Sequence, residues 1–248
     1  MLLLLPPSET KREGGVAGTR LDLAALSYPH LTPARVIALD GLRRLSRNLG
    51  AAAGALRLGP TQGREAARNR AVATSPTMPA LDRYDGVLYD ALAGPTLPPA
   101  AREFAGRHVA IASALFGLTA ALDPIPAYRL SHDSRLPRTP LGALWRGPVA
   151  AAIEATPGFI LDLRSEAYAD LGPLPHRDTA LFLRVVTAEG DGLRRALNHF
   201  NKTGKGEFVR RLLLAGIDHP DAESLLRWAR AAGIRLDRGA AGDLELVV

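Results

Sequence analysis

The apolar run Leu2–Leu5, which stops at the dipeptide Pro6-Pro7, constrains the fold of this chain more than any other feature. Four apolar residues ended by prolines are typical of a short strand buried on both faces of a sheet. Similar runs, separated by segments with helical spacing, lie at Val109–Leu115, Phe159–Leu163 and Thr179–Val186. This mixed order predicts an α/β fold in which a mixed sheet is covered by helices. The length allows a full hydrophobic core, and we expect a single domain over residues 1–248.

The remaining elements follow from the same patterns. Helices are predicted at Tyr84–Leu92, Gly142–Ala155, Thr203–Leu214 and Asp221–Ala232. Two short strands are expected near the end of the chain, at Ile234–Asp237 and Leu244–Val248. Prolines fix a further segment, Leu122–Leu130, in an extended form.

Residues 31–70 form the longest stretch of helical character. Thr32-Pro33 fits a helix start, with threonine as the N-cap and proline in the first turn. Apolar side chains then recur every three or four residues, at Val36, Leu39, Leu42, Leu45 and Leu49. We expect this stripe to face the core, which leaves Arg43 and Arg44 in solvent.

A tight corner interrupts this helical segment. It consists of Leu58, Gly59, Pro60 and Thr61, and a second short helix containing Arg64 follows it. A hydrophobic–glycine turn between two short helices is the layout of a helix-hairpin-helix, which offers backbone N–H groups to a DNA phosphate. The alternative is an ordinary corner, because any helix pair needs such a turn.

The charge and residue composition narrow the classes of partner and site. Lys and Arg outnumber Asp and Glu by 31 to 25, a net charge of +6 that attracts polyanions such as nucleic acid. The alternative explanation of this charge is a GC-rich genome, which also gives an Arg- and Ala-rich composition.

The absence of cysteine excludes disulfides, thiolate nucleophiles and cysteine-based metal sites. Because the six histidines are scattered as well, no metal or cofactor is expected. The short, uncharged opening and the lack of a run of about 20 apolar residues favour a cytoplasmic protein without a membrane partner.

The basic segment His199–Arg211 is the densest group of polar functional residues. It contains Gly-Lys, but His199 stands where a Walker A loop needs its first glycine, so a P-loop is excluded. Helical projection places Lys205 on the same face as the apolar residues of this helix, whereas Arg210 and Arg211 lie elsewhere. The apolar residues are Phe208, Val209 and Leu212.

A lysine on the buried face of a first helical turn needs a partner for its charge. Together with the electropositive helix start, Lys205 predicts a site for an anion. In the alternative interpretation its ammonium extends past the helix end to solvent.

Polar residues follow two of the predicted strands. Ser8, Glu9 and Lys11 come after the first strand, and Ser165 and Tyr168 come after the strand Phe159–Leu163. If these strands are parallel, both loops lie at the carboxyl edge of the sheet, where α/β proteins bind ligands. Taken alone, each loop is explained better by ordinary loop polarity.

Five sequence blocks in this order resemble the YaaA family of peroxide stress proteins, in its actinobacterial form. They are LLLLPPSETK, YDGVLYDAL, HVAIASALFGLTAALDPIPAYRL, FILDLRSEAY and HFNKTGKGEFVRRLLL, and they span nearly the whole chain. The resemblance implies a YaaA-type fold with a helix-hairpin-helix-like element, DNA binding, and protection from peroxide damage through lower free iron. Its recurrent positions fall here on Ser8, Glu9, Lys11, Arg129, Ser165, Tyr168, Asn201, Lys202, Lys205, Gly206 and Arg210.

Three functions follow as hypotheses. The first is a DNA-binding stress protein that uses Leu58, Gly59, Pro60, Thr61 and Arg64 together with the basic residues. The second is an enzyme on a small anionic or nucleotide-like substrate, with Lys205, Tyr168 and Ser165 as candidate catalytic residues. The third is direct iron handling by carboxylates. The predicted anion- or substrate-binding residues are Ser8, Glu9, Lys11, Arg129, Asn201, Lys202, Lys205 and Arg210.

Overall fold

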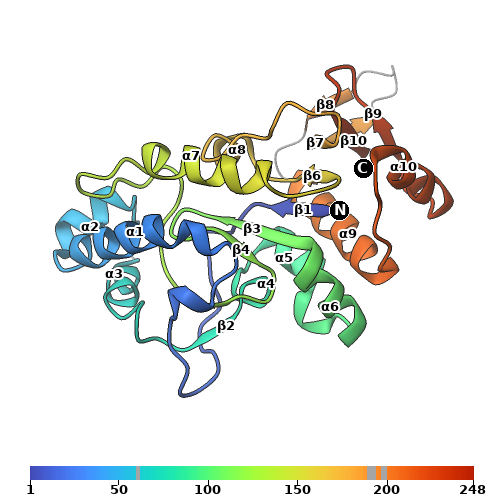
Figure 1. Cartoon of the computed structure of the whole chain (residues 1–248). Helices are drawn as coiled ribbons and strands as arrows, with labels where there is room; N and C mark the ends of the chain where they lie inside the picture. Colours follow the sequence, from blue (N-terminus) through green and yellow to red (C-terminus); the bar gives the residue numbers. More distant parts are fainter. Residues whose placement is uncertain (60–61, 189–193, 197–199) are drawn as a thin grey trace.

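A computed structural model of the chain, which describes residues 1–59, 62–188, 194–196 and 200–248, has a mixed α/β architecture (Figure 1). The main sheet has the strand order β4-β3-β1-β6-β7-β10-β9, and β8 pairs with β7. Its strands are β1 Leu2–Leu5, β3 Val109–Ser113, β4 Gly117–Ala120, β6 Ile160–Asp162, β7 Ala180–Ala188, β8 Arg194–Ala196, β9 Leu236–Arg238 and β10 Leu244–Val247. The α/β class and the helix-covered mixed sheet predicted from the sequence are therefore confirmed.

Strand β1 lies in the middle of this sheet. It pairs in parallel with β3 on one side and with β6 on the other. The next pairs, β6 with β7 and β7 with β10, are parallel as well. All four leucines of β1 are buried, as an apolar run without alternation predicts. The chain leaves β1 toward β3 and later returns to the opposite side as β6, so the direction of winding reverses at β1.

Helices cover both faces of the sheet. In Figure 1, α7 and α8 lie on one side of the strands, and α5, α6 and α9 lie on the other. The helices are α1 Thr32–Leu45, α2 Leu49–Ala55, α3 Gly63–Arg70, α4 Ala80–Arg83, α5 Val87–Leu92, α6 Pro99–His108, α7 Leu141–Glu154, α8 Glu166–Ala169, α9 Phe200–Ala215 and α10 Ala222–Ala231. A two-stranded sheet joins β2 Thr77–Pro79 to β5 Pro124–Pro126. No helix of the described part is long and apolar enough to cross a bilayer.

The predicted apolar stripe of α1 is partly wrong. Val36 is 52% exposed, and Leu49 belongs to the next helix, where it is also exposed. The buried face instead includes Arg35, whose guanidinium donates to the carbonyl oxygens of Phe116 and Leu118 at 3.0 and 2.7 Å. These carbonyls belong to the edge strand β4 and the residue before it. Because the arginine supplies the donors that this edge lacks, α1 turns its Arg35 side toward the sheet.

The helix predicted from Tyr84 begins only at Val87. Tyr84 has an extended backbone and forms an antiparallel bridge with Lys11, so it belongs to the strand-like segment before the helix. Gly86 separates the two with a φ of 110°, a conformation that a residue with a side chain rarely adopts. The chain thus turns at Gly86 directly beside the end of β1, where Ser8 lies.

Two glycines of α9 allow this helix to approach its neighbours closely. A Cβ atom on Gly206 would lie 2.2 Å from the carbonyl oxygen of Leu88 in α5, and one on Gly204 would lie 2.8 Å from Val248. The Gly-Lys-Gly sequence, which was excluded as a phosphate loop, is therefore a packing surface. It holds Lys205, which stands between the two glycines, against the sheet.

Candidate functional site

A cleft of about 580 Å³ opens at the carboxyl ends of β1 and β6. This is where the winding direction of the sheet reverses, the position at which α/β proteins bind ligands. Its walls are the loop after β1, the start of α5, the loop after β6 and the first two turns of α9. The lining residues are Pro6, Pro7, Ser8, Glu9, Thr10, Gly86, Val87, Leu88, Tyr89, Leu163, Ser165, Tyr168, Asn201, Lys202 and Lys205.

Lys205 supplies a buried positive charge to this cleft. Only 6% of the residue is exposed, and its ammonium donates to the carbonyl oxygen of Leu163 at 2.9 Å. The ring of Phe182 lies 5.4 Å from the ammonium. Burial lowers the pKa of Lys205 to about 8, although the nearby Asp162 carboxylate acts in the opposite direction. The predicted inward orientation of this lysine is confirmed, and the alternative with its ammonium in solvent is not.

The Asp162–Arg164 ion pair supports the loop beneath Lys205. Both side chains are completely buried, and two nitrogens of the guanidinium donate to the carboxylate at 2.9 and 2.7 Å. The guanidinium also donates to the carbonyl oxygen of Gly172 at 2.9 Å. Sequence analysis missed this pair. An aspartate inside an apolar strand with an arginine two residues later is the signal that could have found it, because both side chains leave an extended chain on the same side.

Hydroxyl-bearing residues from two loops line the same cleft. Ser8 follows β1, whereas Ser165 and Tyr168 follow β6. Ser165 precedes α8 without capping it through its side chain. Burial raises the pKa of Tyr168 well above its usual value, so its phenol stays protonated at neutral pH. The two loops that sequence analysis expected to converge thus meet at one cleft.

Tyr89 is a lining residue that the sequence did not single out. It is almost fully buried on α5, and its hydroxyl donates to the carbonyl oxygen of Pro6 at 2.7 Å. This bond ties α5 to the loop after β1. Tyr89 lies in the family block YDGVLYDAL, which could have marked it as a candidate. The block also contains Tyr84, however, and spacing alone does not show which of the two tyrosines contacts the loop.

The remaining polar candidates of α9 separate into two groups. Asn201 and Lys202 line the cleft, and Lys202 is exposed. Arg210 lies elsewhere, where its guanidinium donates to the carbonyl oxygens of Leu92 and Ala93 at 2.8 and 3.1 Å. These carbonyls end α5, so Arg210 caps that helix. Arg211 similarly donates to the carbonyl oxygen of Ala232 beyond α10.

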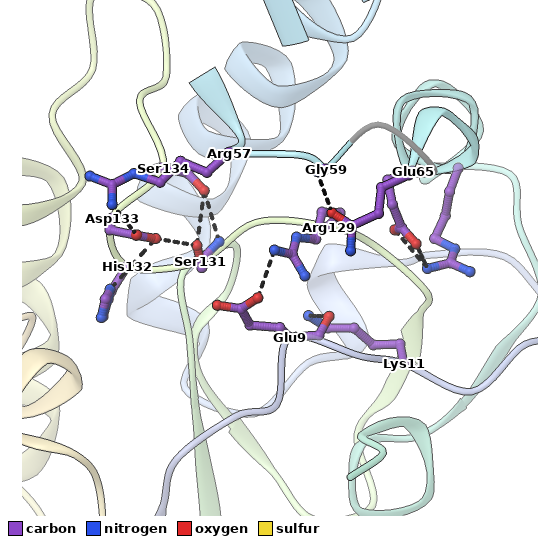
Figure 2. A network of polar contacts seen from close by, with 12 residues as sticks. Glu9, Lys11, Arg57, Gly59, Glu65, Arg129, Ser131, His132, Asp133 and Ser134 are labelled. Atoms are coloured by element: carbon purple, nitrogen blue, oxygen red, sulfur yellow. Dashed lines mark hydrogen bonds and ion pairs between the residues drawn. The ribbon is translucent and has the colours of Figure 1, made fainter. Parts of the chain in front are cut away.

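Lys11 and Arg129 form a separate cluster behind Glu9 (Figure 2). An oxygen of the Glu9 carboxylate lies 2.6 Å from the Arg129 guanidinium, and the Lys11 ammonium donates to the Glu9 backbone carbonyl at 3.2 Å. The Tyr128 ring lies 4.1 Å from this ammonium. Burial, followed by the positive charge of Arg129, lowers the pKa of Lys11 to about 7. The sequence therefore grouped as one set residues that occupy two distinct places.

The predicted DNA-binding corner connects α2 and α3. Leu58 is half-buried, Gly59 and Arg64 are exposed, and the N–H of Gly59 donates to the Gln62 side chain at 2.8 Å. Pro60 and Thr61, like His199, lie outside the described residues. Within the described part of the chain, no three His, Asp or Glu side chains gather as a metal site would require.

The sequence matches the family described as peroxide stress protein YaaA over residues 1–237. The chain belongs to this family. The YaaA match covers both the cleft and the Lys11–Arg129 cluster, and only the end of the chain, including β10, lies outside it.

Three relatives of the chain are UPF0246 proteins of actinobacteria. One from Corynebacterium glutamicum strain R is 43% identical over 239 residues, which is 94% of each chain. One from Corynebacterium efficiens is 42% identical over 255 aligned positions, covering both chains completely. A third, from Streptomyces coelicolor, is 38% identical over 245 residues, which is 97% of this chain and 93% of the relative. The actinobacterial resemblance expected from the sequence blocks is therefore confirmed.

Proposed function

We propose that this protein acts in the cytoplasm during peroxide stress by binding DNA and thereby limiting iron-driven oxidative damage. The observation that carries the proposal is the Lys205 ammonium, which faces the cleft and has no carboxylate in salt-bridge distance among the described residues. A buried cation of this kind is stabilised by an anionic ligand. The phosphates of DNA are such anions, and the exposed Lys202 at the same cleft adds a second positive charge.

Two further features support DNA as the partner. The net charge of +6 attracts polyanions. The corner between α2 and α3 presents the exposed Arg64 at the start of α3. Because the Gly59 N–H is already bonded to Gln62, a phosphate at this corner would bind Arg64 and other groups of α3.

The test is the salt dependence of binding to a fluorescently labelled DNA duplex. Affinity should fall linearly on a log–log plot, with a slope of about 0.9 for each phosphate contacted. Lys202→Met should weaken binding and reduce the slope by about one phosphate contact. The matched control is Arg107→Met, which removes an exposed charge from α6 just before β3, at the opposite end of the strands from the cleft.

Two outcomes would contradict DNA binding at the cleft. One is an absence of binding even at low ionic strength. The other is an equal loss for Lys202→Met and Arg107→Met, because the binding would then follow net charge and not the position of the lysine.

A second candidate function is an enzymatic reaction on a small anionic or nucleotide-like substrate. It is favoured by one observation, the lysine pKa lowered to about 8 in the cleft that also holds Ser165 and Tyr168. A neutral Lys205 could accept a proton from a substrate, and the protonated phenol of Tyr168 could donate one. When protonated, Lys205 would instead serve as an electrostatic clamp.

Lys205→Arg separates these two roles, because arginine keeps its positive charge in this pH range. Wild-type protein and the variant would be incubated with a set of nucleoside phosphates, and products would be followed by mass spectrometry. If Lys205 is a base, the variant should bind the converted nucleotide but lose its turnover. Turnover at the wild-type rate in Lys205→Arg would exclude the base role, and an absence of conversion by the wild type would exclude these substrates.

A further inference from the structure

Lys11 and Arg129 bury two positive charges side by side. Lys11 is 3% exposed and Arg129 is 8% exposed. Their mutual repulsion contributes to the lowered pKa of Lys11. Two enclosed cations of this kind need anionic or hydrogen-bonding partners to offset the lost hydration.

The protein supplies fewer acceptors than these two side chains have donors. The Lys11 ammonium bonds to one backbone carbonyl, and the Arg129 guanidinium pairs with one carboxylate, that of Glu9. The Nε of Arg129 is buried without a hydrogen-bond partner among the described residues. The nearby Glu65 is itself occupied, because Arg68 donates to both of its oxygens at 2.9 and 2.7 Å.

The backbone around these cations is fixed by its own hydrogen bonds. Asn69 of α3 accepts from the Arg129 N–H at 2.8 Å and donates to the Arg129 carbonyl at 2.9 Å. Lys11 forms a backbone bridge with Tyr84. The backbone positions of Lys11 and Arg129 therefore do not depend on the Glu9 side chain.

Glu9 is the weakly held member of the cluster. Its side chain is 60% exposed, and Figure 2 shows its carboxylate reaching back to Arg129. An ion pair with one partner largely in solvent contributes little to stability, so another anion can displace this carboxylate.

We infer that Lys11 and Arg129 form a second anion site, for a phosphate group, which Glu9 closes with its own carboxylate when no ligand is bound. A phosphate has enough oxygens to accept from both the Nε and a terminal nitrogen of Arg129 and from the Lys11 ammonium. Glu9 also lines the cleft, so the two sites are neighbours. They use different cations, and the second site needs no DNA in the cleft.

The experiment measures binding of inorganic phosphate by titration calorimetry to the full chain. Glu9→Gln should bind phosphate about ten-fold more tightly than wild type, because Arg129 loses its competing carboxylate. Glu103→Gln is the matched control, since it removes an exposed, ion-paired carboxylate from α6. It should leave phosphate binding unchanged.

Double variants decide which cations hold the phosphate. The gain in Glu9→Gln should persist with Lys205→Met and disappear with Arg129→Met. Arg129→Lys keeps the positive charge but loses the paired N–H donors of the guanidinium, so it should reduce the gain in phosphate affinity. This variant replaces Arg129→Met if the latter does not fold. Competition between phosphate and a DNA duplex in Glu9→Gln then distinguishes a free ion from a DNA diester as the natural source.

Two results would overturn the second site. The first is equal phosphate affinity in Glu9→Gln and Glu103→Gln. The second is a gain that Lys205→Met abolishes and the Arg129 variants leave intact, which would place the phosphate in the cleft and leave the proposed DNA site standing.

Discussion

Lys205 and Lys11 are both buried lysines, but their surroundings differ in charge and in access. Lys205 faces a cleft, and the carboxylate of the buried Asp162–Arg164 pair partly supports its charge. Lys11 is enclosed by two tyrosine rings and stands beside a second cation, Arg129. The pKa is accordingly lower for Lys11, about 7, than for Lys205, about 8. Burial is the largest cause of both shifts, and the neighbouring charges act in opposite directions: Arg129 adds to the effect of burial at Lys11, whereas Asp162 opposes it at Lys205.

The largest effect is expected when Asp162 loses its charge. Asp162→Asn leaves Arg164 fully buried without a counter-charge, which should lower the free energy of unfolding at pH 7 by about 3–5 kcal/mol. It should also lower the pKa of Lys205 further, toward that of Lys11, because Asp162 opposes the effect of burial. Urea denaturation measures the first quantity. The exposed control Glu103→Gln should change it by less than about 0.5 kcal/mol, and an equal loss in both variants would contradict the role given to the pair.

A smaller effect is expected when α9 is moved away from α5. In Gly206→Ala the new methyl group meets the Leu88 carbonyl oxygen, so the helix must shift, at a cost of about 2 kcal/mol. The shift should weaken the hydrogen bond from the Lys205 ammonium to the Leu163 carbonyl oxygen, whereas the Lys11 cluster should not be affected. Thermal unfolding provides the measurement. Gly142→Ala in α7 has open space around its Cβ position and should be neutral or slightly stabilising.

The pH dependence of stability separates the two lysines directly. Each has a folded pKa below its unfolded value of 10.5, so the unfolded state binds the proton more strongly. Stability should therefore rise with pH from about 7 for Lys11 and from about 8 for Lys205, by up to about 1.4 kcal/mol per pH unit for each.

Lys11→Met should remove most of the slope of the stability profile between pH 7 and 8. Lys205→Met should remove a smaller part of it there, because Lys205 loses its proton mainly as the pH reaches 8 and above. Urea denaturation at half-unit pH steps gives this profile. A slope in the 7–8 interval that disappears in Lys205→Met and persists in Lys11→Met would reverse the assigned order.

The smallest effect is expected in the rates of amine acylation. The chain has three lysines, and the third, Lys202, is exposed and serves as the internal control. At pH 8, Lys205 should react several-fold faster than Lys11 despite its higher pKa, because Lys205 lines the cleft and Lys11 does not. Peptide mass spectrometry after a short exposure to acetic anhydride gives the three rates. Faster modification of Lys11 would show that its enclosure is not maintained in solution.

The sequence predicted the strands and the orientation of Lys205 better than it predicted α1. A short apolar run that ends at prolines, such as Leu2–Leu5, predicts a buried strand, because it is too short for a helix. The predicted face of α1 was only partly right, with Leu42 and Leu45 buried, because a long-range contact turns the helix: the Arg35 guanidinium donates to the carbonyls of Phe116 and Leu118 on the edge of the sheet. No local periodicity contains that information.

The same limit applies to the site. Ser8, Ser165 and Lys205 could be assigned to one place because the carboxyl ends of parallel strands meet at one edge. Spacing could not show that Lys11 and Arg129 form a second cluster, or that Arg210 caps α5, since these contacts join segments far apart in the chain.

The most direct test of the proposal that the cleft binds an anion is the pKa of Lys205 with and without DNA. Protein labelled with ¹³C at the lysine Cε gives three resonances, one for each lysine, which can be followed through a pH titration. A phosphate in the cleft should raise the pKa of Lys205 from about 8 when a DNA duplex is added, and it should shift Lys11 less, because Glu9 closes that site. A Lys205 pKa that stays unchanged at saturating DNA would contradict the proposal that this cleft receives the anion.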